Sequence, residues 1–67
     1  MTLRDLILTG PEEALYWTYD AEGTFIDIQT YSITLNEVRI ELEMEVDIWR
    51  VRDEVELTIG VILKEVI

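Results

Sequence analysis

The residues from Val38 to Ile48 alternate between apolar and charged side chains, and this pattern constrains the fold more than any other feature. In these eleven residues, all six even-numbered positions are apolar and all five odd-numbered positions are charged. The side chains of a strand point to opposite faces in turn, so strict alternation predicts a half-buried β-strand. On a helix the same apolar side chains would be scattered around the axis.

The start of the chain predicts a short helix. Thr2 is suited to the N-cap position, and Asp5, three residues later, completes a capping box. Gly10 followed by Pro11 is expected to end this helix after about two turns. Three apolar residues share one face of it: Leu3, Leu6 and Ile7.

Three turns are expected to divide the remainder into four strands, with hairpins near residues 20–23, 35–38 and 51–54. The first turn fits a type I turn closed by Gly23, and it pairs Tyr19 with Thr24. Near residues 29–30 the apolar residues change from even-numbered to odd-numbered positions. One extra residue there, a β-bulge, would keep them on the same face of the strand. The third loop is expected to have two residues or more. A loop of two residues would place the charged Arg50 opposite the apolar Val55, which favours a longer loop.

Together these elements predict a mostly β protein: a four-stranded antiparallel meander behind a short N-terminal helix, forming a single domain over residues 1–67. A strand over residues 38–48 would be about 36 Å long. A helix of eight residues is about 12 Å long and cannot cover such a sheet. We therefore expect either a small barrel or two sheets packed face to face in a dimer.

Composition excludes several classes of function. The chain has 67 residues, 15 of them acidic and 5 basic, with a formal charge of −10 and neither Cys nor His. Disulfides, Cys/His zinc sites and catalysis by His-dependent triads are thereby excluded, and the few scattered cations do not form a nucleic-acid-binding surface. We predict that the protein is not an enzyme and uses no cofactor or metal, because a chain this small lacks residues to enclose a pocket.

Size and composition also bear on assembly and location. A core in a chain below about 70–80 residues rarely supplies more than about 3–5 kcal/mol, which favours a homo-oligomer, most simply a dimer. The apolar run at residues 6–8 is too short for a signal peptide, and no stretch approaches the ~20 apolar residues of a membrane span. A cytoplasmic location and no membrane partner are therefore expected.

The outer face of the predicted third strand is acidic. Trp49 is odd-numbered like the acidic residues of this strand and would lie on the same face. Glu56 falls opposite Trp49 in the predicted register. One interpretation is a solvated face that keeps a small β protein soluble. The other is a surface that binds a basic protein partner, with Trp49 as an anchor. The second interpretation gives these partner-binding residues: Glu41, Glu43, Glu45, Asp47, Trp49 and Glu56.

The opening residues 1–7, followed by an acidic hairpin sheet, resemble small acidic proteins encoded by phages and prophages. Characterised proteins of that kind include anti-CRISPR and anti-restriction inhibitors. The resemblance implies a phage-type inhibitor that binds a host nucleic-acid-binding defence protein through an acidic face that mimics nucleic acid. It also implies that the protein works in the host cytoplasm and does not itself bind nucleic acid.

An alternative function is a small structural or assembly protein, such as a virion or complex subunit, whose function is its own homo-oligomer. Salt distinguishes the two functions. A complex held by charge weakens steeply as salt rises, whereas an apolar assembly does not.

Overall fold

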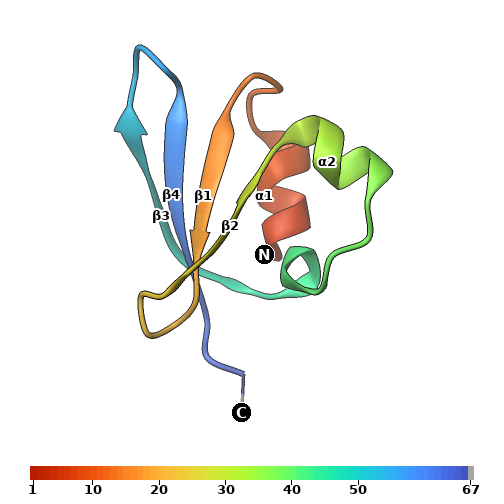
Figure 1. The fold of residues 1–67 in the computed structure, drawn as a ribbon, viewed down its shortest axis with the longest axis vertical. Helices are drawn as coiled ribbons and strands as arrows, with labels where there is room; N and C mark the ends of the chain where they lie inside the picture. Colours follow the sequence, from red (N-terminus) through yellow and green to blue (C-terminus); the bar gives the residue numbers. More distant parts are fainter. Residues whose placement is uncertain (67) are drawn as a thin grey trace.

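The computed structural model describes residues 1–66 and shows four strands beside three short helical segments (Figure 1). In chain order the elements are α1 (Leu3–Thr9), β1 (Leu15–Tyr19), β2 (Phe25–Gln29), α2 (Tyr31–Asn36), the 3₁₀ turn η1 (Ile40–Glu43), β3 (Val46–Asp53) and β4 (Thr58–Leu63).

The sheet is mixed and open, so the predicted antiparallel meander and the predicted barrel are both wrong. Its strand order is β2-β1-β4-β3. β1 pairs antiparallel with β2, and β3 pairs antiparallel with β4, but β1 and β4 run parallel. After β2 the chain crosses one face of the sheet through α2 and η1, and it re-enters at the far edge as β3 (Figure 1). This crossover allows β4 to return between β3 and β1.

The N-terminal helix forms as its capping residues predict. Thr2 Oγ1 accepts a hydrogen bond from the Asp5 backbone N–H at 3.2 Å, and Asp5 Oδ2 accepts one from the Thr2 N–H at 3.2 Å. The N–H of Gly10 donates to the carbonyl of Ile7 at the other end. Leu3, Leu6 and Ile7 are buried against the sheet, as their shared face predicts.

Residues 31–36, predicted as strand, form helix α2. Thr30 is its N-cap, because its side chain accepts a hydrogen bond from the Ile33 N–H at 3.1 Å. Arg4 of α1 donates to the carbonyl of Thr34 at 3.1 Å and thereby joins the two helices. The parity change near residues 29–30 is therefore the boundary between β2 and a helix, not a bulge, and the predicted hairpin at residues 35–38 is absent.

The alternating segment that predicts a strand over residues 38–48 is divided between a loop, η1 and the start of β3. Val38 is 97% exposed and Ile40 is 84% exposed, whereas Leu42 is fully buried in the core. The N–H of Leu42 donates to the carbonyl of Arg39, and that of Met44 donates to the carbonyl of Glu41, which closes the 3₁₀ turn. Tertiary packing of one leucine thus outweighs the local pattern.

Two predicted turns are present, although their strand registers differ from those predicted. In the first, Gly23 has φ of 87°, and Asp20 Oδ1 accepts hydrogen bonds from the N–H groups of Glu22 and Thr24. Tyr19 pairs with Phe25 rather than with Thr24, and Ile26 of β2 forms a bulge between this pair and the next one. The β3–β4 loop is the longer of the two predicted forms and spans residues 54–57.

The core lies between the helices and one face of the sheet. Its buried apolar residues come from α1, η1, β1, β4 and the loop before β1: Leu3, Leu6, Ile7, Ala14, Tyr16, Leu42, Ile59, Val61 and Leu63. In residues 1–66 the three helical segments all lie on this side, and none covers the opposite face (Figure 1).

Candidate protein-binding surface

The uncovered side of the sheet carries the side chains that alternate with those of the core. On β1, Tyr16 and Thr18 are buried, so the residues between and beside them point away from the helices. The same alternation applies to β4, where Ile59, Val61 and Leu63 are buried. We call this surface the open face, and its main residues are Leu15, Trp17, Tyr19, Phe25, Ile28, Ile48, Arg50, Arg52, Thr58 and Ile62.

Three aromatic rings form a cluster on the open face. The ring centroid of Phe25 lies 5.6 Å from that of Trp17 and 5.7 Å from that of Tyr19, and the Tyr19 pair has edge-to-face geometry. Phe25 is paired with Tyr19 across the β1–β2 ladder, which accounts for their contact. Aromatic pairs of this geometry add about 0.5–1.5 kcal/mol beyond their buried area, so the cluster forms a firm apolar surface.

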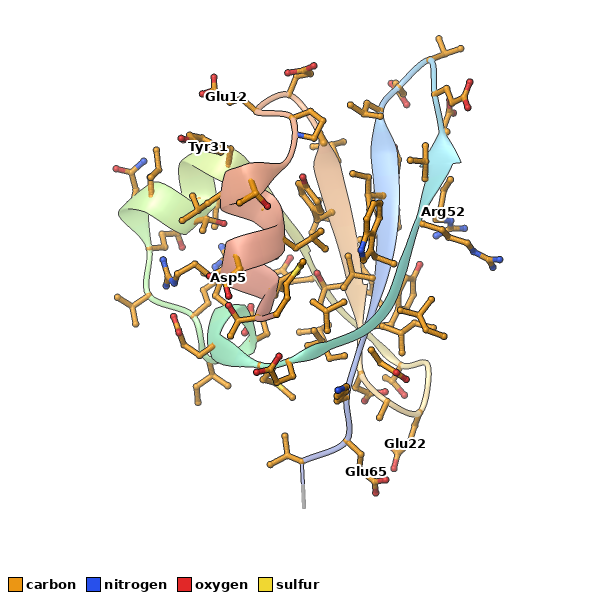
Figure 2. All side chains as sticks on the ribbon, turned by 180° about the vertical axis from the view of Figure 1, so that it is seen from behind. Asp5, Glu12, Glu22, Tyr31, Arg52 and Glu65 are labelled. Atoms are coloured by element: carbon orange, nitrogen blue, oxygen red, sulfur yellow. The ribbon has the colours of Figure 1, made fainter. Side chains whose placement is uncertain are left out.

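Arg52 crosses the sheet from β3 to β1. Its Nη1 donates a hydrogen bond to the hydroxyl of Tyr19 at 2.8 Å, although β4 lies between the two strands. Gly60 on β4 makes this path possible, because a Cβ atom at residue 60 would lie only 2.8 Å from Cδ of Arg52. In Figure 2, Arg52 extends from the side of the molecule opposite the helices.

A shallow groove of about 430 Å³ follows this crossing. It is lined by residues of β1, β3, β4 and the β1–β2 turn: Tyr19, Gly23, Ile48, Arg50, Arg52, Gly60 and Ile62. Both guanidinium groups of β3 therefore border an apolar depression next to the aromatic cluster.

The open face also differs from the rest of the molecule in charge. Arg4 pairs with Glu43 at 2.7 Å, and Arg39 pairs with Asp27 at 2.8 Å and with Glu37 at 3.1 Å. Within residues 1–66, neither Arg50 nor Arg52 forms an ion pair.

Figure 2 shows Glu12 and Glu22 at opposite ends of the sheet, away from Arg52. A chain with a formal charge of −10 thus presents two arginines without ion pairs on one face.

Arg39 has a structural role away from the open face. Its hydrogen bond to Glu37 raises the pKa of its guanidinium above the ordinary value for arginine, and the charges of Asp27 and Glu41 act in the same direction. Arg39 also lies 3.4 Å from the side-chain oxygen of Gln29, whose amide donates to Glu41 at 2.7 Å. This polar network fastens the loop after α2 to the end of β2.

The acidic residues predicted for partner binding do not form a row on one strand. Glu41 and Glu43 belong to η1, where Glu41 accepts a hydrogen bond from Gln29 and Glu43 pairs with Arg4. Glu45 precedes β3 and pairs with the N-terminal ammonium group at 2.8 Å. The premise of a ladder along a single strand is wrong, because residues 40–43 form a 3₁₀ turn.

The other three predicted site residues lie on or after β3. Asp47 is exposed at a bulge between the pairs made by Val46 and Ile48. Trp49 is 47% exposed and pairs with Val61 on the helix side of the sheet, and Glu56 is exposed in the β3–β4 loop. Their role in partner binding remains a prediction.

The binding residues predicted from the sequence do not include the open face. Trp17 lies there in the aromatic cluster, beside Gly60 of β4. A signal was present, because Trp17 and Tyr19, like Arg50 and Arg52, are two residues apart and so share one face of a strand. The parallel pairing of β1 with β4, which brings the two pairs together, has no local sequence signal.

Over residues 1–66 no helix is both long enough and apolar enough to cross a membrane. In that same part of the chain, His, Cys, Asp and Glu side chains form no group of three or more that could hold a metal ion. No family of known proteins, no curated protein and no solved structure matches this chain.

Proposed function

We propose that this protein is a non-catalytic protein-binding module and that the open face is its binding surface. The observation that carries the proposal is the uncovered sheet face, where Trp17, Tyr19 and Phe25 lie beside the groove bordered by Arg50 and Arg52. Trp, Tyr and Arg are the residue types enriched among those that dominate binding energy at protein interfaces. A rigid sheet presents them without further ordering.

The chemistry of the groove indicates the kind of partner surface. Its apolar lining and aromatic neighbours favour apolar side chains, and its two arginines favour a carboxylate among them. A polyanion such as nucleic acid is disfavoured, because the whole chain carries a charge of −10. The partner is therefore a protein with an apolar patch and an acidic side chain within it.

Photo-crosslinking in cells tests this assignment. A photoreactive amino acid in place of Trp17 should give a defined protein adduct, whereas one in place of Leu35, exposed on α2, should not. Arg50→Glu should lower the adduct yield from position 17 by about tenfold or more, as expected for an arginine that dominates binding. Lys64→Glu makes the same charge change outside the groove and should leave the yield unchanged.

Equal adduct yields from positions 17 and 35, or a yield insensitive to Arg50→Glu, would show that the open face is not the binding surface. Arg50 suits this test because its side chain forms no hydrogen bond or ion pair within residues 1–66. The variant is therefore expected to keep the stability of the native chain.

An acidic binding surface is the second candidate, and the β3–β4 loop supports it. Glu54 and Glu56 are exposed there, and neither forms an ion pair within residues 1–66. This candidate retains the phage-type inhibitor of a host nucleic-acid-binding defence protein, acting in the cytoplasm on a basic partner. Glu43 and Glu45 are poor test positions, because their ion pairs hold Arg4 and the N-terminus.

A crosslinker at Val55, which is 99% exposed between the two glutamates, tests the acidic surface. If a basic partner binds there, the adduct should be lost in the double variant Glu54→Lys/Glu56→Lys and in high salt, because the attraction is screened over about 8 Å at physiological ionic strength. An adduct that survives both changes would exclude a charge-driven complex at this loop.

A further inference from the structure

β3 is an edge strand whose outer side is largely unprotected. It spans eight residues, and all except the first are exposed. The N-terminal residues cover only its beginning, where the carbonyl of Met1 accepts from the Val46 N–H at 2.8 Å and the Leu3 N–H donates to the carbonyl of Met44 at 2.9 Å. Residues 47–53 have β4 on one side and no strand on the other within residues 1–66.

Of the features that usually protect an edge strand, the middle of β3 has only one charged side chain, that of Arg50. Proteins commonly place Lys, Pro or a bulge there to prevent pairing with another chain. β3 contains neither Lys nor Pro. Its two bulges lie toward its ends, between Val46 and Ile48 and between Val51 and Asp53. The segment from Ile48 to Val51 between them pairs residue for residue with β4 and is regular.

The charge of β3 also differs from that of the chain. Its eight residues include two Asp and two Arg, so the strand is formally neutral while the whole chain carries −10. Three large apolar side chains are exposed along it: Ile48, Trp49 and Val51. Local charge therefore does not oppose the approach of a second copy of this edge.

We propose that β3 pairs antiparallel with β3 of a second copy, about a two-fold axis at Trp49. In this register residues 47–51 of the two copies pair, Trp49 faces Trp49 of the second copy and Ile48 faces Arg50, so no like charges lie directly opposite within the paired segment. Like charges directly opposite each other destabilise a sheet, whereas paired aromatic rings stabilise it. Such an isologous contact closes as a dimer and leaves no repeating surface.

Other symmetric registers are disfavoured by the residues that they would pair. An axis at Arg50 places Arg50 opposite itself and Asp47 opposite Asp53. An axis at Val51 places Arg50 opposite Arg52. An axis at Ile48 leaves only residues 47–49 to pair, because the outer edge at Val46 already bonds to Met1.

The dimer joins two four-stranded sheets into one of eight strands. The two open faces then lie on the same side of a continuous sheet, with Arg50 and Arg52 of both copies near its centre. This proposal concerns the edge of the sheet and does not depend on what binds the open face. Because each copy carries −10, raising the salt concentration should strengthen the dimer by screening the repulsion between copies.

Disulfide crosslinking tests the register directly, because the native chain contains no cysteine. Trp49→Cys should give a disulfide-linked dimer under mild oxidation, since Cβ atoms of residues directly opposite each other are about 4.5–5.5 Å apart. Ile26→Cys on the other edge strand and Trp17→Cys on the open face are the controls. Neither should form a disulfide-linked dimer, because neither position faces its counterpart across the β3–β3 contact.

Sedimentation of cysteine-free chains provides the second measurement. The native chain should form dimers whose fraction increases with protein concentration and with salt. Ile48→Lys would face Arg50 of the second copy and should shift the chain to monomer, whereas Val55→Lys, outside the paired segment, should not. A native chain that stays monomeric at about 100 µM in high salt, or efficient crosslinking through position 17 or 26 instead of 49, would overturn the proposal.

Discussion

Replacing Leu42 with alanine is expected to lower the free energy of unfolding by about 2–5 kcal/mol, the range for a buried leucine truncated in a core. Leu42 is fully buried and connects η1 to the core beneath α1. A core in a chain of this size supplies only about 3–5 kcal/mol, so most of the variant should be unfolded at room temperature. Urea titration followed by circular dichroism measures the change.

The matched control is Ile40→Ala, two positions earlier in the same alternating pattern. Ile40 is 84% exposed, so its truncation should change the free energy of unfolding by no more than about 0.5 kcal/mol, as at other surface positions. A half-buried strand over residues 38–48 would instead make both substitutions comparably harmful. Similar losses for the two variants would therefore contradict the 3₁₀ turn.

The substitution Gly10→Ala is expected to lower the free energy of unfolding by about 1–3 kcal/mol, the usual range for overpacking. The Cβ atom of Gly10→Ala would collide with the hydroxyl oxygen of Tyr16 and would lie 3.1 Å from the carbonyl oxygen of Leu6. The backbone of Gly10 is extended, with φ of −94°, so the effect comes from lack of space and not from backbone strain.

Tyr16→Phe should remove most of this penalty. Without the hydroxyl group, the nearest ring atom to the new Cβ is Cζ at 3.5 Å, an ordinary van der Waals contact. Thermal unfolding of the native chain, the two single variants and the double variant forms a double-mutant cycle. If Gly10→Ala is equally harmful in both backgrounds, the hydroxyl is not what restricts residue 10.

The same cycle reports on the buried hydroxyl of Tyr16, which has no hydrogen-bond partner within residues 1–66. An unsatisfied buried polar group destabilises a fold by about 1–3 kcal/mol, so Tyr16→Phe alone should be neutral or stabilising. Burial, with a smaller contribution from Glu13, raises the pKa of Tyr16. Because the pKa is higher in the folded state, stability should fall as pH rises above about 10, and Tyr16→Phe should lack this component.

Local sequence chemistry determined the parts of the fold that depend on few neighbours. The capping box of Thr2 and Asp5 determined α1, and the aspartate and glycine of residues 20–23 determined the first turn. Each of these elements is specified by hydrogen bonds or dihedral preferences within about four residues. The β3–β4 hairpin followed from its two apolar strands, although not its register.

The alternating segment shows why the rest was not predictable. A period of two tells which side chains point the same way in a strand, but it does not tell which of them another element will cover. Packing under α1 selected Leu42 and left Val38 and Ile40 in solvent. Once one leucine is anchored in this way, a 3₁₀ turn replaces the strand.

The sequence by itself thus determined the terminal helix, the first turn, the presence of strands within residues 15–29 and 46–63, and the acidic charge of the chain. Only the tertiary structure decided the candidate binding surface. Tyr19 and Arg52 are 33 residues apart in the chain, and their hydrogen bond requires the crossover through α2 and the parallel pairing of β1 with β4. That pairing is set by burial of one sheet face against the helices, a non-local free energy that no short segment encodes.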